Sequence, residues 1–147
     1  MFYGQYSHSL DSKGRLIVPS KFRDVLRENY GEKFYVTAGA DKCLLAYLED
    51  EWDKLQKKVR DLPEGKAKAR TLKRIMFSQA CDVLCDKQGR ILIPKNLLDF
   101  AAIRKDVIIA GVGNHFEIWD VKLWSQDYEG SLGTYQEIVE ELSEEGF

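Results

Sequence analysis

Two glycine–arginine pairs are the residues of this chain best suited to bind a charged partner. Each pair lies in the same nonapeptide pattern, D-x-x-G-R followed by three aliphatic residues and a proline: "DSKGRLIVP" at 11–19 and "DKQGRILIP" at 86–94. The glycine permits a tight turn, and the arginine after it can present a fork of N–H donors to a phosphate or to guanine O6 and N7. Lys13 and Lys87 place a second cation in each turn. The two nonapeptides therefore predict a paired basic edge that binds nucleic acid.

The aspartate that begins each nonapeptide allows two interpretations. In an Asp-x-x-Gly turn the carboxylate can accept backbone N–H bonds, so Asp11 and Asp86 are predicted to stabilise the turns. The same carboxylates could also pair with Arg15 and Arg90 and so reduce the charge that is offered to a partner. The residue types alone leave both possibilities open.

No catalytic or metal-binding constellation accompanies these turns in the sequence. His8 and His115 stand alone, and Cys81 and Cys85 lack a second ligand pair at the spacing of a zinc site. The chain has no G-x-S-x-G, no H-E-x-x-H and no phosphate loop. We therefore predict a protein that is not an enzyme and that holds neither a cofactor nor a metal.

The two nonapeptides belong to a longer internal repeat. Residue 86 follows residue 11 by 75 positions, and the later apolar stretches at 34–39 and 106–111 are 72 positions apart. "RLIVP" and "RILIP" are short and rich in aliphatic residues, so they predict buried strands. One unit then reads turn, strand, short helix, two strands, and an aromatic residue entering a helix. Two units are too few for a solenoid, so we predict a pseudo-dimer with a shared core.

Charge is strongly segregated along the chain, although the formal net charge is only −2. Residues 54–74 hold nine basic and two acidic residues, whereas residues 127–147 hold seven acidic and no basic ones. Apolar spacing predicts two basic helices joined at 63–65, and an acidic helix that begins with a capping box formed by Thr134 and Glu137. The two charged regions are either solvated surfaces or faces that meet across subunit boundaries.

The composition limits the size and the setting of the protein. A chain of 147 residues, 44% of them hydrophobic, can form one compact domain or two very small ones packed together. It has no run of apolar residues long enough to span a membrane, and its start does not read as a signal peptide. Three cysteines without a disulfide rhythm favour a reducing cytoplasm.

The motifs together resemble the MraZ family of bacterial transcriptional regulators. The resemblance is carried by "MFYGQYSHSLDSKGRLIVPSKFR" at the start, "LCDKQGRILIP" in the middle and the closing aromatic elements, and it covers essentially the whole chain. It implies an α+β fold with a mainly β core, built as a pseudo-two-fold double swapped-hairpin (AbrB-like) β-barrel decorated with helices. The implied parts are a first SpoVT/AbrB-like repeat at 5–52, a basic helical hairpin linker at 53–80, a second repeat at 81–124 and an acidic C-terminal helix at 125–147.

The resemblance also implies a function. Family members bind direct repeats in the promoter of the division-and-cell-wall gene cluster, usually repress it, associate with the nucleoid and assemble into rings. The implied partners are double-stranded DNA and further copies of the chain, with no membrane. The alternative is a protein-interaction or assembly module, because related swapped-hairpin barrels serve as antitoxins and assembly platforms. The predicted DNA-binding residues are Lys13, Gly14, Arg15, Lys87, Gly89 and Arg90, with Asp11 and Asp86 stabilising the turns.

The second nonapeptide differs from the first at one charged position. Gln88 stands where the first copy has Lys13, so the second turn lacks the lysine next to its glycine. Lys87 lies one position earlier, where an extended chain would point it to the other side. We therefore expect Arg15 to contribute more to DNA binding than Arg90.

Overall fold

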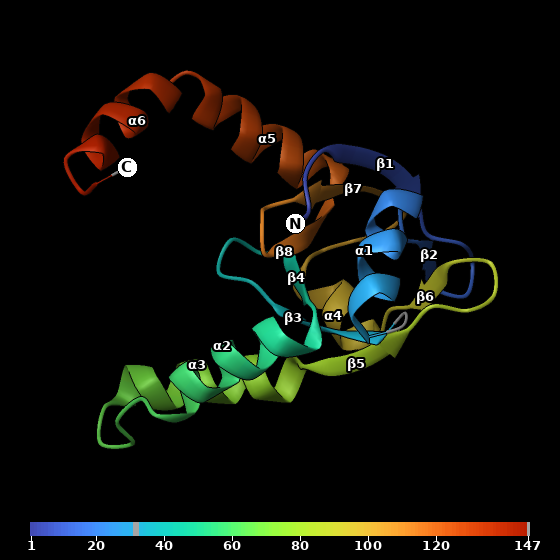
Figure 1. The fold of residues 1–147 in the computed structure, drawn as a ribbon, viewed down its shortest axis with the longest axis horizontal. Helices are drawn as coiled ribbons and strands as arrows, with labels where there is room; N and C mark the ends of the chain where they lie inside the picture. The colour runs from blue at the N-terminus through green and yellow to red at the C-terminus, as the bar shows by residue number, and fades with distance from the viewer. Residues whose placement is uncertain (31–32, 147) are drawn as a thin grey trace.

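Strands from both halves of the chain form the centre of the fold in the computed structural model, which describes residues 1–30 and 33–146. The strands are β1 (Gln5–Ser9), β2 (Arg15–Ile17), β3 (Lys33–Ala38), β4 (Leu44–Tyr47), β5 (Cys81–Leu84), β6 (Arg90–Leu92), β7 (Asp106–Gly111) and β8 (His115–Asp120). The helices are α1 (Ser20–Tyr30), α2 (Glu49–Arg60), α3 (Ala67–Gln79), α4 (Lys95–Phe100), α5 (Val121–Leu132) and α6 (Tyr135–Ser143). The predicted α+β class is confirmed, and Figure 1 shows the helices arranged around the strands.

The strands pair between the two halves of the chain. Six of them form an antiparallel sheet in the order β1-β7-β8-β4-β3-β5, while β2 and β6 form a separate two-stranded ribbon. This order is symmetric for the two halves of the chain: β1 and β5 are the edge strands, β7 and β3 lie next to them, and β8 and β4 form the centre. Strand β1 therefore pairs with a strand of the second half, and β5 pairs with a strand of the first.

The expectation of a closed β-barrel is wrong. Within the described residues, β1 and β5 remain the edges of the six-stranded sheet and do not pair with each other. The reason is local: each edge strand runs into an Asp-x-x-Gly turn, which directs the chain away from the sheet before the edges can meet. The ribbon of β2 and β6 contacts both edge strands and lies between them (Figure 1).

The main core draws its side chains from both halves. The rings of Phe2, Phe22 and Phe116 all contact one another, with centroids 5.1–5.2 Å apart. Leu16 and Ile91, which face each other in the ribbon, are buried in the same cluster. Because aliphatic and aromatic side chains of both repeats fill one interior, the two ribbon strands are held firmly under their turns.

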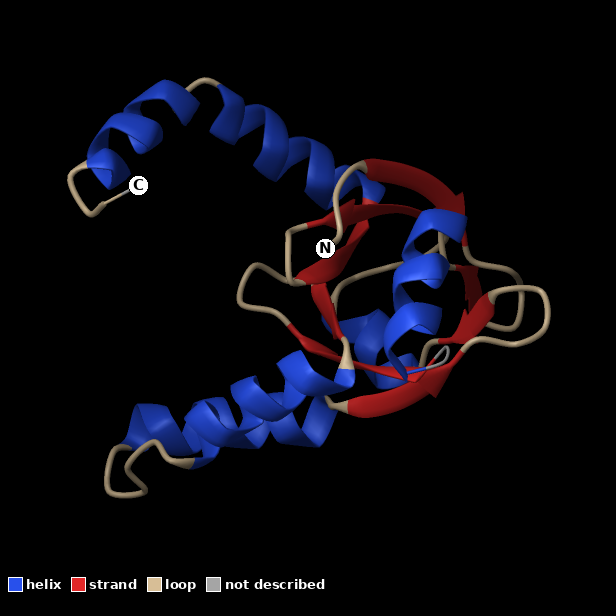
Figure 2. Ribbon diagram, viewed as in Figure 1, coloured by secondary structure: helices blue, strands red, loops and turns tan. Residues whose placement is uncertain are grey.

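Two helical arms extend from the sheet on the side opposite the ribbon (Figure 2). The arm of α2 and α3 packs through Trp52, Val59 and Met76, and the buried Thr37 hydroxyl donates to the carbonyl of Met76 at 2.6 Å. The arm of α5 and α6 is attached through an aromatic series in which Trp124 contacts Trp119 and stacks on Tyr128. No helix among the described residues is long and apolar enough to span a membrane.

The predicted capping box at the start of α6 is wrong. The Thr134 hydroxyl donates to the carbonyl of Ser131 at 3.2 Å, and the amide of Thr134 donates to the same carbonyl at 3.1 Å. Thr134 therefore bonds back to the end of α5 and does not cap the next helix. The preceding helix extends closer to Thr134 than the sequence pattern indicates, and its free carbonyls compete for the side chain.

Candidate nucleic-acid interface

The first glycine–arginine turn is organised by Asp11. Its carboxylate accepts the amides of Lys13 and Arg15, both at 2.9 Å, while its own carbonyl accepts the amide of Gly14 at 3.1 Å. Gly14 has a φ of +80°, in the left-handed region that side chains disfavour. The aspartate and the glycine together therefore determine the shape of the loop that precedes β2.

The second turn repeats this geometry. Asp86 accepts the amides of Gln88 and Arg90, both at 2.9 Å, and Gly89 has a φ of +78°. The position that is Lys13 in one copy and Gln88 in the other contributes only its backbone amide to the turn. Its side chain can therefore differ without altering the loop, which explains why turns with lysine and with glutamine at this position have the same shape.

Backbone bonds join the two turns across the ribbon. The carbonyl of Gly14 accepts the amide of Ile93 at 3.1 Å, and the carbonyl of Gly89 accepts the amide of Val18 at 2.9 Å. Both loops project on the same side of the molecule, away from the two helical arms (Figure 1). The structure thus brings the two predicted sites, 75 residues apart in sequence, to one end of the protein.

Both arginines pair with the aspartate of their own turn. The Nε atom of Arg15 lies 2.6 Å from Asp11 Oδ2, and that of Arg90 lies 2.9 Å from Asp86 Oδ2. The two arginine side chains are still 31% and 26% exposed. Within residues 1–30 and 33–146 their other guanidinium nitrogens make no hydrogen bond. The ion pair therefore orients each guanidinium while leaving donors for an external acceptor.

The turn aspartates are strongly biased toward their charged form. The amide of Arg15, followed by its side chain, lowers the pKa of Asp11 from 3.8 to about 2. The amide of Arg90 likewise lowers the pKa of Asp86. Each carboxylate thus offsets one arginine charge near neutral pH, and the lysine of each turn leaves both turns net positive.

The structure adds a cation that the sequence analysis missed. Arg23 of α1 donates from Nε to the carbonyl of Val18 at 3.1 Å and lies against Gly89, where an added Cβ would meet its Cζ at 2.6 Å. Leu98 takes the equivalent place beside Gly14, at 3.8 Å from such a Cβ. The offset of 75 residues already aligns Arg23 with Leu98, but only the ribbon pairing shows that each contacts the turn of the other half.

A family model described as "MraZ protein, putative antitoxin-like" matches residues 1–75 and again 76–147. The chain belongs to the MraZ family. Each matched segment contains one Asp-x-x-Gly-Arg turn, so the predicted resemblance and its two tandem copies are confirmed. The family description, that of an antitoxin-like protein, suggests a regulatory role.

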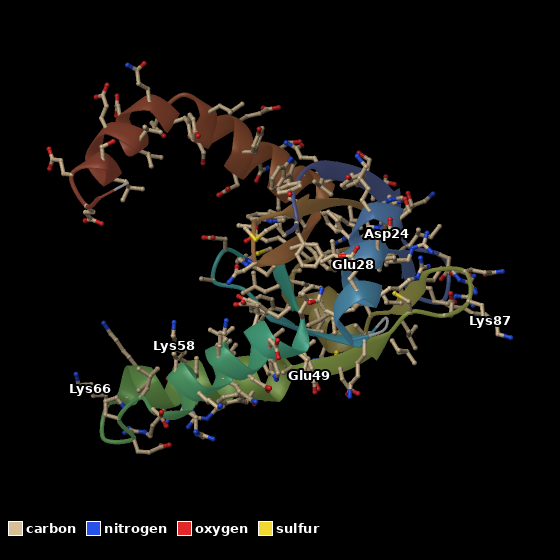
Figure 3. All side chains as sticks on the ribbon, in the orientation of Figure 1. Asp24, Glu28, Glu49, Lys58, Lys66 and Lys87 are labelled. Atoms are coloured by element: carbon tan, nitrogen blue, oxygen red, sulfur yellow. The ribbon has the colours of Figure 1, made fainter. Side chains whose placement is uncertain are left out.

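The lysines of this MraZ-family chain extend the basic end of the molecule. Lys13 and Lys87 are exposed, and Lys87 lies at the outer tip of its loop (Figure 3). The exposed Lys105 is brought to the base of the first turn, because its carbonyl accepts the amide of Leu10 at 2.8 Å. In the described part of the chain, no three His, Cys, Asp or Glu side chains are grouped to hold a metal.

Proposed function

We propose that this protein is a sequence-specific DNA-binding transcriptional regulator that represses the bacterial division-and-cell-wall gene cluster. The observation that carries the proposal is the pair of turns with the same backbone hydrogen bonds at one end of the molecule, each with a partly exposed arginine. A regulator that binds promoter DNA acts in the cytoplasm at the nucleoid.

The proposed contact uses the donors that the aspartates leave available. Because Nε of Arg15 and of Arg90 is held by a carboxylate, the guanidinium plane is oriented before DNA arrives, and less side-chain entropy is lost on binding. The remaining donors can bind a phosphate, or guanine O6 and N7 in a major groove that admits a two-stranded ribbon. Lys13, Lys87 and Arg23 supply further positive charge for the phosphates.

Several subunits are needed for useful affinity. One subunit can neutralise only a few phosphates, so alone it binds weakly and with strong salt dependence. We propose a ring of identical subunits that presents successive turns to direct repeats spaced by about one helical turn (~10 bp). Linking weak contacts in this way raises their effective concentration.

The test is a DNA-binding titration of Arg15→Ala, with DNA from upstream of the chain's own gene and a non-cognate promoter as control. Removal of one arginine fork costs about 1–3 kcal/mol per occupied site, and several sites act together, so specific binding should be lost. Arg60→Ala, which removes an exposed arginine at the far end of α2, should bind like the parent. Arg15→Ala protein that folds and assembles normally and still binds as tightly as the parent would refute the proposal.

A protein-binding role is the second candidate, and the antitoxin-like description of the family favours it. A protein-binding surface generally relies on aromatic anchors, whereas the turns offer lysine and arginine. Retention of the parent on immobilised DNA that falls steeply with salt supports the DNA-binding proposal. No retention at low salt would favour the protein-binding module.

A further inference from the structure

A hollow beside the first turn carries positive charge that the two turns do not account for. It lies where β7 begins and β8 passes into α5, and its volume is about 470 Å³. The basic side chains that line it are Arg104, Lys105 and Lys122. All three are exposed, and within residues 1–30 and 33–146 none of them pairs with a carboxylate or donates a side-chain hydrogen bond. We call this feature the β7–α5 hollow.

The two carboxylates of the β7–α5 hollow make hydrogen bonds that hold the local structure. Asp106 accepts the hydroxyl of Ser9 at 2.7 Å. Asp120 accepts the amides of Lys122 and Leu123, at 3.1 and 3.2 Å, and so caps the start of α5. The three cations outnumber these two carboxylates, so the hollow has a net positive charge that attracts an anion.

Backbone contacts place the hollow next to the first turn. The carbonyl of Lys105 accepts the amide of Leu10 at 2.8 Å, and the turn begins with the next residue, Asp11. The carboxylate of Asp11 lies 2.6 Å from Arg15 Nε, so the backbone of Lys105 is on the order of 10 Å from the Arg15 side chain. A DNA duplex carries one negative charge for about every 1.7 Å of its axis. DNA that is bound at Arg15 therefore has phosphates within reach of the hollow.

The equivalent place beside the second turn, where β3 and α2 begin, is acidic. Lys33 precedes Lys105 by 72 positions, and it lies 4.0 Å from the carboxylate of Asp82. Asp50 precedes Lys122 by the same offset and replaces its charge with the opposite one. Helix α2 also begins with three consecutive acidic residues. The repeat thus has a basic surface beyond one turn and an acidic surface beyond the other.

We propose that the β7–α5 hollow binds the phosphate backbone of DNA next to the bases that the first turn contacts. DNA is the occupant because the hollow continues the basic surface of the turn, and phosphate is the anion that a duplex presents there. Exposed lysines and arginines without internal partners suit contacts that position DNA without reading its sequence. The inference rests on the proposed function, since the turns must hold the duplex first.

The hollow gives each subunit a direction on the DNA. The same backbone bonds hold both turns, so the ribbon alone presents nearly the same surface to a duplex in either direction. Arg23 lies against the second turn itself, so its charge does not carry the contact beyond the ribbon. A basic hollow at one end and an acidic helix start at the other favour the direction in which the DNA continues over the hollow. Subunits that share a direction suit direct repeats, whereas a two-fold symmetric surface suits a palindrome.

The first test removes the three cations of the hollow and measures affinity at several salt concentrations. We call Arg104→Ala/Lys105→Ala/Lys122→Ala the hollow variant. The slope of log affinity against log salt should fall by about one unit for each cation that contacts a phosphate. Because phosphate contacts carry no sequence information, affinity should fall by the same factor on promoter DNA and on the non-cognate promoter.

Two further variants control for folding and for general charge. A charge-conserving set, Arg104→Lys/Lys105→Arg/Lys122→Arg, should keep the parental slope. The same loss of charge on the arm opposite the ribbon, made at exposed lysines, should also keep it: Lys58→Ala/Lys66→Ala/Lys68→Ala. Each variant is compared with the parent by thermal melting and by light scattering, and each should keep a cooperative transition and the parental molar mass.

Hydroxyl-radical footprinting on the same promoter DNA tests the direction. The hollow lies beyond the first turn only, so its contacts fall on one end of the DNA segment that each subunit protects. The hollow variant should therefore lose protection at one end of each protected segment, and at the same end in every repeat. The variant of the opposite arm should leave the whole footprint unchanged.

A hollow variant that folds, keeps the parental mass and retains the parental salt slope and footprint would overturn the inference. Loss of protection at both ends of the segments would overturn the proposed direction. Arg15→Ala, measured on the same DNA, separates this inference from the proposed function. If Arg15→Ala loses specific binding while the hollow variant behaves like the parent, only the role of the hollow is refuted.

Discussion

The first turn lies against Leu98 and the second against Arg23, although the same hydrogen bonds hold the two backbones. The duplicated geometry depends on bonds within five residues, so it is kept wherever the aspartate and the glycine are kept. The neighbour of each turn comes from the opposite half and can change independently. Each turn carries one aspartate, one lysine and one arginine, so Arg23 makes the immediate surroundings of the second turn more positive than those of the first.

The largest expected difference between the turns lies in their tolerance of a side chain at the glycine. Gly14→Ala places a methyl group in ordinary van der Waals contact with Ile93 and Leu98, so it should lower the free energy of unfolding by about 1–2 kcal/mol through left-handed backbone strain alone. Gly89→Ala must also displace Arg23 and break its bond to Val18, which adds about 1 kcal/mol. Chemical denaturation measures both changes.

An Arg23→Ala background is the control for this prediction. In that background, Gly89→Ala should lower the free energy of unfolding by no more than Gly14→Ala lowers it in the parent. If the extra loss at Gly89 persists without the arginine side chain, the packing of Arg23 is not its cause.

Exchanging the two neighbours is the next strongest test. Arg23→Leu gives the second turn the apolar neighbour of the first, and it should reduce the slope of log affinity against log salt by about one unit per DNA-bound subunit. Leu98→Arg should raise this slope by a similar amount at the first turn. DNA titrations at several salt concentrations measure the slope, and an unchanged slope in both variants would show that neither position faces the phosphates.

Restoring the missing lysine should have a smaller effect. Gln88→Lys adds a cation at the position of Lys13 without changing the turn, because only the backbone amide of residue 88 is bound there. Affinity for promoter DNA should rise a few-fold and the salt slope should steepen. Gln136→Lys, on the distant α6, is the matched control, and an equal gain in that variant would indicate a general charge effect.

The smallest expected effect is one that the two turns share. Because folding lowers the pKa of Asp11 from 3.8 to about 2, its stabilisation is complete above about pH 4 and is lost as the pH falls toward 2. The melting temperature of Asp11→Asn should therefore be lower than that of the parent at pH 6. The difference in melting temperature should disappear between pH 4 and pH 2. Asp86→Asn should behave in the same direction.

The control is Asp127→Asn, which removes a carboxylate from the exposed surface of α5. Its melting temperature should follow that of the parent across the same pH range. A gap for Asp11→Asn that stays constant down to pH 2 would show that ionisation of the carboxylate does not stabilise the turn.

The local features of the site were predictable from the sequence because they depend on short-range chemistry. Asp11 and Gly14 define a turn through bonds to residues within four positions, and the aliphatic runs after both turns form the expected strands β2 and β6. The prediction that these strands are buried is correct only for Leu16 and Ile91, since Ile17 and Leu92 are exposed on the other face of the ribbon. The pairing of Arg15 with Asp11 was one of two open interpretations. The structure shows that pair at Nε, with the other donors of the guanidinium still available.

The features that the sequence analysis missed depend on contacts between the halves. Arg23 reaches Gly89 only because β2 pairs with β6, and no periodicity within one repeat encodes that pairing. The prediction of a closed barrel was wrong because the turns after β1 and β5 direct the chain into a separate ribbon, and the two edge strands therefore do not pair with each other. The cap at Thr134 was wrong because the end of α5 competes for the same hydroxyl.

Because each half of the chain pairs a strand with the other half, we expect the fold to survive a break in the chain between α2 and α3. Strand β1 lies in a sheet with β7, and β5 with β3, so neither half can unfold alone without stripping strands from the other. A single proteolytic cut at the exposed Gly65 should leave two fragments that co-elute on size exclusion and separate only in denaturant. By the same reasoning, the halves produced as separate polypeptides should reconstitute the protein by fragment complementation.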